Sequence, residues 1–460
     1  MGENATAPAP HLERRLGTFQ ATALNMANMV GVGPFLTIPL IVEKLPGRHV
    51  MLGWALGLVV VLADSMIWCE LGAALPGSGG TYHFLKEVFR PFRFGRLVPF
   101  LFIWQFIFSG PLEAASGCIG FVNYLSRIWP ESWGALDASG ALTFQGKMVG
   151  SSLAALAVVL LYRKIGSIGK LTVCLWVGML ATVVVAIAAA ASRFDPARAF
   201  APVPGGFHLD AKFAVALGAA LNIALYDFLG YYDICYLGDE VRDPVRTIPR
   251  AVVTSVLAVA AIYSVMNIGI LGALPRTEID SFKSAVFTHL VQSAWGNWPA
   301  NLFTVLILWT AFASVFALLL GYSRIPFAAA RDGYFFRAFA DLHPTRDFPR
   351  LSLLILGAVT MVACWLPFDR VLTALLASRI LVQFVVQILA VVLVRRARPD
   401  IHLPFRMWLY PLPCLVALAG WLYAFGSSGG DSIAFSLGSL ILGILTFALI
   451  FRVRRAGVGP

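Results

Sequence analysis

Long apolar segments recur along the whole chain and restrict it to a membrane fold. Segment 50–74, "VMLGWALGLVVVLADSMIWCELGAA", exceeds the roughly 20 residues that a helix needs to cross a hydrocarbon core. The 460 residues are 59% hydrophobic and 13% charged, whereas a soluble domain has about 25% charged residues. Because these runs are continuous and do not alternate with polar residues, they predict helices and not barrel strands. The sequence therefore predicts an all-α membrane protein.

Twelve segments have this character, and each is predicted to be a transmembrane helix. Their spans are 18–42, 50–74, 97–127, 147–162, 171–192, 213–237, 249–274, 300–322, 351–367, 371–394, 408–426 and 431–451.

The distribution of basic residues predicts the orientation. With the N-terminus inside the cell, 24 of the 35 Lys and Arg residues fall in cytoplasmic segments and 10 in outer segments. This is the excess that the positive-inside rule requires. The net charge of +11 therefore favours a membrane protein over a nucleic-acid partner. We expect a multi-pass protein of the plasma or inner membrane with both termini in the cytoplasm.

The first predicted helix contains residues that break helices. Its middle, "NMVGVGPFLTIPL" (28–40), carries Gly31, Gly33, Pro34 and Pro39. Glycine costs about 1 kcal/mol and proline about 3 kcal/mol inside a helix. Unwound backbone is tolerated in a membrane only where protein or a water-filled cavity satisfies it. A kink against a neighbouring helix is the alternative.

A second interruption is predicted in the sixth helix. Segment Tyr226–Asp233, "YDFLGYYD", places two acids, a glycine and three tyrosines inside an apolar run. Paired broken helices are typical of secondary transporters built from two inverted five-helix repeats. We therefore expect a ten-helix core at 18–394, with repeats 18–192 and 213–394, then two helices in 408–451, flanked by tails 1–17 and 452–460.

Four motifs resemble those of one transporter superfamily. They are "VGVGPF" (30–35), "CELGAALPGSGGTYHFLKEVF" (69–89), "GDEVRDPVRTIPRAV" (238–252) and "YSRIPFAAARDGYFFRAFADLHP" (322–344). In this order they are similar to the amino acid–polyamine–organocation superfamily, which has the LeuT fold. The resemblance implies transport by alternating access, with the solute between broken helices 1 and 6. The usual Gly-Ser-Gly-Ile-Phe of helix 1 is here Gly31-Val32-Gly33-Pro34-Phe35.

Two branches of this superfamily compete. One is the light-chain-like amino acid transporters, and the other is the polyamine:proton symporters. "FSGPLEAASGCIGFVNYL" (108–125) resembles helix 3 of the second branch and puts Glu113 at the place of a polyamine-coordinating acid. Arg379 has no counterpart there. The resemblance therefore implies a small amine-bearing solute, either an amino acid or a polyamine.

Charged residues inside the apolar segments mark candidate sites. A charge near the bilayer centre costs roughly 2.5–3.5 kcal/mol on insertion scales, so such residues usually have a function. These segments contain four acids and one base, which favours binding of a cation, either a proton or a cationic substrate. The acids are Asp64, Glu113, Asp227 and Asp233, and the base is Arg379. We predict proton coupling, or an ion pair, for Asp64, Glu113, Asp233 and Arg379. Backbone amides near Val32 and Gly33 are also placed to bind a carboxylate.

These considerations predict two sets of residues. The substrate site is predicted at Val30, Gly31, Val32, Gly33, Glu113, Tyr226, Asp227, Gly230 and Tyr231. A cytoplasmic gate is predicted at Glu70, Asp239, Glu240 and Arg331, with Arg246 and Arg250 as further basic partners, and fixed ion pairs on the cytoplasmic surface are the alternative.

Other classes of protein lack support in the sequence. There is no His-Glu-x-x-His, no Gly-x-Ser-x-Gly and no P-loop motif, and the cysteines have no metal-ligand spacing. We therefore expect no enzyme, no metal and no cofactor. A membrane sensor that binds the same solute without carrying it is the alternative function.

Overall fold

The computed structural model describes residues 16–456, except 46, 78, 130–132, 138–139, 163–167, 202–209 and 344–347. This part of the chain is helical, with three isolated β-bridges in its connections. Of the predicted tails, residues 1–15 and 457–460 lie outside the described residues, and 452–456 continue the last helix.

Each of the twelve apolar segments contains a helix. The helices are α1 (Thr18–Met29) with α2 (Gly33–Lys44), α3 (Val50–Ala74), α5 (Leu97–Leu125), α6 (Phe144–Leu161), α7 (Ile168–Ser192), α9 (Ala211–Phe228), α10 (Pro244–Ala273), α13 (Asn297–Tyr322), α15 (Arg350–Ala363), α16 (Phe368–Arg379) with η8 (Ile380–Val385) and α17 (Val386–Ala397), α18 (Leu412–Gly426), and α19 (Gly430–Ala456).

Length and composition identify fewer spans than the twelve predicted. Among the described residues, eight helices are long and apolar enough to cross a membrane, or nine if α1 and α2 form one bent span. Three others are apolar but shorter, at Val177–Ser192, Arg350–Ala363 and Leu412–Gly426. The all-α membrane fold is confirmed, and the count of twelve spans stays a prediction.

Short helices fill the connections. They are η1 (Gly47–His49), α4 (Thr81–Phe89), α8 (Pro196–Ala199), η4 (Asp233–Tyr236), η5 (Gly238–Glu240), α11 (Arg276–Ser281), η6 (Lys283–Ala285), α12 (Val286–Trp295), α14 (Arg324–Arg331) and η7 (Arg337–Ala340).

The first span breaks where glycine and proline predicted it. Helix α1 ends at Met29, α2 begins at Gly33, and the two are bent by 51°. Pro34 lies in the first turn of α2, where its missing N–H costs nothing. Pro39, in contrast, lies inside α2 and does not end it.

The sixth span is also interrupted, but its continuation differs from a second long half-helix. Helix α9 ends at Phe228, and Gly230 follows with φ of +105°. The predicted helix 213–237 is therefore too long at its end, because only the 3₁₀ segments η4 and η5 follow the break. Glycine adopts this positive φ without the steric penalty that other residues meet.

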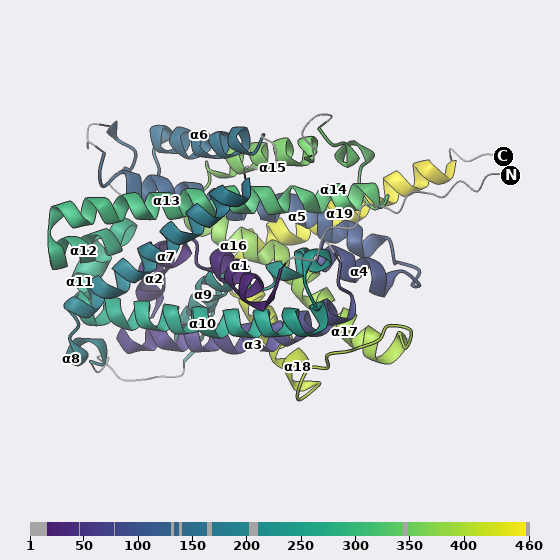
Figure 1. Cartoon of the computed structure of the whole chain (residues 1–460), viewed down its shortest axis with the longest axis horizontal. Helices are drawn as coiled ribbons and strands as arrows, with labels where there is room; N and C mark the ends of the chain where they lie inside the picture. The colour runs from purple at the N-terminus through teal and green to yellow at the C-terminus, as the bar shows by residue number, and fades with distance from the viewer. Residues whose placement is uncertain are drawn as a thin grey trace.

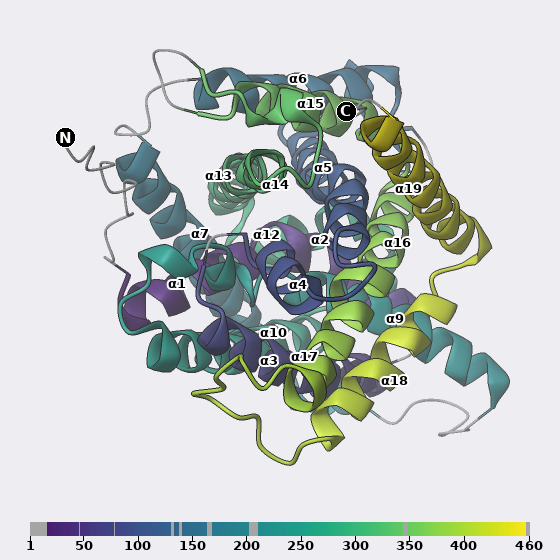
Figure 2. The ribbon, with the colours of Figure 1, turned by 90° about the vertical axis from the view of Figure 1, so that its right-hand side faces the viewer.

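Helices α5 and α13 contact each other directly and lie beneath the α6–α15 pair in Figure 2. Helix α1 packs on α10, and α3 packs on α9 and α10. Helix α5 also packs on α16, and α13 also packs on α7. Helices α6 and α15 pair at one edge, whereas α18 and α19 lie on the outside of the bundle (Figures 1 and 2). This packing brings the two interrupted spans together.

Candidate functional site

The two helix breaks touch each other. A Cβ on Gly230 would lie 2.9 Å from the Asn28 Cβ and 3.1 Å from the Asn28 carbonyl carbon. The hydroxyl of Tyr263, on α10, lies 2.7 Å from the Met29 carbonyl oxygen and 2.9 Å from the Asp227 carbonyl oxygen. Close backbone approach at a glycine and one shared tyrosine therefore hold the end of α1 against the end of α9.

Asn25 satisfies the unwound backbone after α9. Its Nδ2 donates to the Tyr231 carbonyl oxygen at 2.6 Å, and its Oδ1 accepts from the Ile234 amide at 2.9 Å. The side chain is fully buried. Each unpaired backbone group in a membrane costs several kcal/mol. By pairing two such groups, this asparagine lowers the free-energy cost of the break.

The start of α2 leaves backbone donors unused. Among the described residues, the amides of Gly31, Val32 and Gly33 have no hydrogen-bond acceptor. They lie at a helix N-terminus, where amide groups and the helix dipole favour an anion. The geometry suits a carboxylate.

A small cavity of about 30 Å³ lies against these amides. Its walls come from the two breaks, from α5 and from α13. The lining residues are Asn28, Met29, Gly31, Val32, Gly33, Glu113, Ser116, Gly117, Tyr226, Asp227, Leu229, Ser314 and Leu318.

Asp227 places a carboxylate in this cavity. One oxygen, Oδ2, accepts a hydrogen bond from the Thr37 hydroxyl. The other, Oδ1, is buried and has no partner among the described residues. A Cβ on Gly33 would lie 2.5 Å from this oxygen, so only glycine leaves room for it. A buried carboxylate oxygen without a donor is unfavourable, and binding a cation or a proton would stabilise it.

Glu113 is the second acid of the cavity, and it is paired. Its Oε2 lies 2.7 Å from Nη2 of Arg379 and accepts from the Tyr322 hydroxyl at 2.7 Å. Arg379 is only 2% exposed and does not line the cavity. Glu113 and Arg379 therefore form an ion pair in the structure, and a part for them in proton coupling stays a prediction.

Asp233 faces a second, larger cavity of about 870 Å³. Its Oδ2 accepts from Nδ2 of Asn28 at 2.7 Å, and its Oδ1 has no partner among the described residues. Asn28 and Leu318 line both cavities, so the small one adjoins the large one. We call the large cavity the vestibule.

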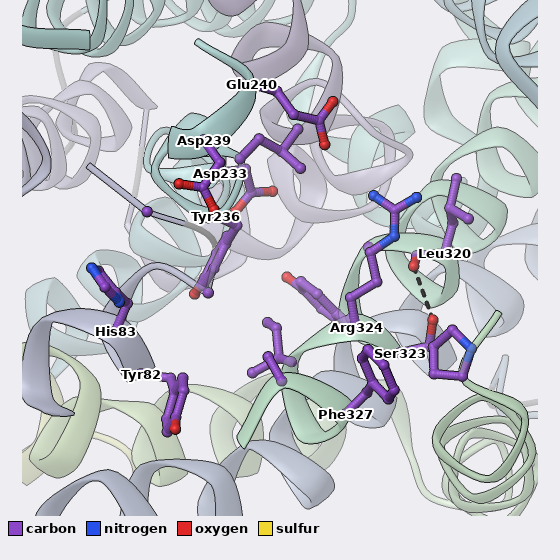
Figure 3. A pocket seen from close by; sticks show the side chains of 18 of the residues that line it. Tyr82, His83, Asp233, Tyr236, Asp239, Glu240, Leu320, Ser323, Arg324 and Phe327 are labelled. Atoms are coloured by element: carbon purple, nitrogen blue, oxygen red, sulfur yellow. Dashed lines mark hydrogen bonds between the residues drawn. The ribbon is translucent and has the colours of Figure 1, made fainter. Parts of the chain in front are cut away.

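Charges of opposite sign line the vestibule. Figure 3 shows Asp233, Asp239 and Glu240 beside Tyr236, with Arg324 and Phe327 across the open space. Arg331 and Lys86 also line it, and Lys86 pairs with Asp332 at 3.0 Å. Burial lowers the pKa of His83, another lining residue, so its imidazole is neutral at physiological pH.

The predicted basic neighbours of Glu70 are not the ones that the structure gives it. Asp239, Glu240 and Arg331 share the vestibule, but Glu70 does not line it. Instead Glu70 binds Arg395 through Nε and Nη2, both at 2.6 Å, and accepts from the Met407 amide at 2.7 Å. Helix α3 also packs on α17, whose last turn carries Arg395, and this residue takes the place of the predicted Arg246, Arg250 or Arg331 as the partner of Glu70.

Asp64 lies apart from both cavities. It accepts hydrogen bonds from the indoles of Trp68 at 2.9 Å and Trp421 at 3.1 Å, and from the Tyr231 hydroxyl. Tyr231 therefore faces Asp64 and not the small cavity. Three donors stabilise this buried carboxylate, and it has no basic partner in the part of the chain that the structure describes.

The remaining predictions divide into two groups. Gly31, Val32, Gly33, Glu113, Tyr226 and Asp227 line the small cavity, whereas Val30, Gly230 and Tyr231 support it without lining it. Sequence reasoning missed six lining residues, because single small, amide or apolar residues in a membrane helix do not by themselves indicate a site; they are Asn28, Met29, Ser116, Gly117, Leu229 and Leu318. It also missed Arg324, which the sequence offers only as one of several basic residues after α13.

The comparisons with known proteins agree with this architecture. The family model described as amino acid permease matches residues 16–452. An uncharacterized transporter of Mycobacterium tuberculosis is 29% identical over 352 residues, covering 76% of this chain and 73% of that protein.

Two relatives from Bacillus subtilis have named substrates. A branched-chain amino acid permease is 24% identical over 97% of this chain and 95% of its own length. A serine/threonine exchanger is 25% identical over 91% of each chain. These proteins are transporters and not enzymes. With the family model spanning nearly its whole length, the chain belongs to the amino acid permease family of the amino acid–polyamine–organocation transporters.

Proposed function

We propose that this protein carries a neutral amino acid across the cell membrane by alternating access, held between the α1–α2 break and the end of α9. The observation that carries the proposal is that the small cavity holds both hydrogen-bond donors without an acceptor and a carboxylate oxygen without a donor. Three amides at the start of α2 suit a carboxylate, and Asp227 Oδ1 suits an ammonium group. A free amino acid carries both an ammonium group and a carboxylate group on its α-carbon. Relatives that are named for branched-chain amino acids and for serine and threonine support this substrate class.

A polyamine is the second candidate, and the ion pair weighs against it. A diamine needs two separated acids, and Glu113 was the predicted second one. Because Arg379 lies 2.7 Å from Glu113, the charge of that acid is already compensated. Asp227 then remains as the single unpaired acid that lines the small cavity within the described residues.

The packing supports a two-repeat transport core. We match each of the first five predicted spans to the span five places later. The contact of α3 with α9 then corresponds to that of α10 with α1, and the contact of α5 with α16 to that of α13 with α7. Inverted repeats generate paired contacts of this kind. We propose twelve spans with both termini in the cytoplasm, which makes the open vestibule an inward-facing one.

The transport experiment uses proteoliposomes with labelled L-serine and L-leucine, an inward proton gradient, and unlabelled putrescine and spermidine as competitors. We expect saturable uptake of at least one amino acid that the polyamines do not inhibit. Putrescine uptake without amino acid uptake would move the protein to the polyamine branch. Binding without counterflow would identify the sensor that the sequence left open as an alternative.

Asp233 is the proposed proton carrier. Of the acids predicted for coupling, Asp64 has three donors and Glu113 has a basic partner, whereas Asp233 keeps an unpaired oxygen beside the vestibule. An inward gradient of one pH unit supports about tenfold accumulation in a one-proton symporter. In Asp233→Asn we expect this accumulation to vanish while exchange of internal for external substrate continues.

The matched control for Asp233→Asn is Asp243→Asn, a nearby acid that does not line the vestibule. It should accumulate substrate as the wild type does. Gradient-driven accumulation that survives Asp233→Asn would assign coupling to another group.

A further inference from the structure

We propose that the Glu113–Arg379 pair sets the charge class of the transported solute, by keeping a buried cation neutralised next to the substrate cavity. This inference rests on the proposed amino acid transport and adds the selectivity of the same site. Glu113 is the specificity-determining residue that lines the cavity, and Arg379 is the charge behind it.

Hydrogen bonds and aromatic contacts hold Arg379 in place in addition to its ion pair with Glu113. Its Nη1 donates to the Tyr232 hydroxyl and its Nε to the Ser109 hydroxyl, both at 3.3 Å. Its guanidinium lies 5.7 Å from the ring centre of Phe106 and 5.5 Å from that of Tyr322. These neighbours are uncharged, so they fix the position of the guanidinium without cancelling its charge. Glu113 supplies the cancelling charge.

The position of Arg379 in its helix strengthens this assignment. It is the last residue of α16, and the π-helical segment η8 begins directly after it. π-helical segments are rare and often occur at functional sites.

Glu113 lies between Arg379 and the substrate. It lines the small cavity together with Ser116 and Tyr226, which are hydrogen-bonded to each other at 2.6 Å. Arg379 lines neither cavity. A neutral solute side chain therefore lies next to an ion pair with no net charge. An acidic side chain meets the Glu113 carboxylate, and a basic side chain competes with Arg379 for it.

Neutralising either partner should expose the charge of the other. In Glu113→Gln the shape is kept and the guanidinium loses its counter-charge, so an acidic side chain becomes the favoured solute. In Arg379→Gln the carboxylate becomes free, so a basic side chain becomes favoured. The two single variants therefore shift selectivity in opposite directions.

The test measures inhibition of labelled neutral amino acid uptake by L-glutamate and L-lysine, together with direct uptake of both. Wild type should discriminate against both. Glu113→Gln should gain about tenfold or more in apparent affinity for glutamate, and Arg379→Gln about as much for lysine, since tenfold is a modest value for a close charge pair. The double variant, with neither charge, should return to neutral solutes.

Glu70→Gln is the matched control, because it breaks another Arg–Glu pair outside both cavities, in which Glu70 is buried and Arg395 is partly exposed. Whatever it does to total uptake, it should leave the glutamate-to-neutral and lysine-to-neutral ratios unchanged. If Glu113→Gln is poorly folded, Arg379→Gln tests the proposal from the other side.

The outcomes separate this inference from the proposed function. Neutral amino acid uptake in wild type, with unchanged selectivity in both single variants, would overturn the charge-class assignment and leave amino acid transport standing. A wild type that prefers glutamate would also overturn it. No amino acid uptake by wild type would reject the proposed function, and the inference with it.

Discussion

Asp227→Asn is expected to lose about 100-fold or more in amino acid affinity, with uptake falling to background. The amide keeps the shape of the side chain and can still accept from Thr37. It cannot provide the charge that the unpaired Oδ1 offers to an ammonium group. Because the substrate is desolvated in this cavity, the lost ion pair is not replaced by water.

Binding to purified protein by isothermal calorimetry or scintillation proximity would measure the loss directly. Asp210→Asn is the control on the same helix, since Asp210 caps the start of α9 far from the break. It should bind like wild type. Thr37→Val should be intermediate, because it removes one hydrogen bond and no charge. Near-normal affinity in Asp227→Asn would remove this residue from the substrate site.

Gly230→Ala is expected to abolish the site by separating the two breaks. A methyl group there would meet Asn28 Cβ at 2.9 Å, the Asn28 carbonyl carbon at 3.1 Å and the Met29 amide nitrogen at 3.2 Å. Two of these three atoms belong to the backbone, so a change of side-chain rotamer cannot relieve the collision. The φ of +105° adds strain for any side chain. We expect uptake below a few per cent of wild type and a lower melting temperature.

Gly429→Ala separates the two causes. Gly429 has a similar φ of +83°, but nothing lies within 4 Å of its added Cβ. This variant carries the backbone strain without the collision, so it should melt lower than wild type yet transport at a comparable rate. If Gly230→Ala resembled Gly429→Ala in transport, the close approach of the breaks would not be needed for function.

Local sequence features predicted the elements of this protein well. Apolar runs located the helices, because desolvating the backbone in a bilayer requires internal hydrogen bonds and a long apolar surface. Gly31, Gly33 and Pro34 located the first break, and Gly230 lies at the second, because the conformational limits of glycine and proline are properties of single residues. The extent of the sixth helix was overestimated, since apolar residues continue beyond the break into η4.

The sequence did not predict which partner each buried charged residue has. Glu113 meets Arg379, Glu70 meets Arg395, and Asp64 meets Trp421, each across hundreds of residues. Most spans are apolar on every side, so their sequences do not reveal which face points to a neighbour. The sequence alone thus determined the membrane fold, the breaks and the set of acids. Only the packing of α3, α5, α16, α17 and α18 decided which acids gain a partner and which, like Asp227, keep an oxygen without one among the described residues, because pairing depends on helix rotation and contact between distant segments.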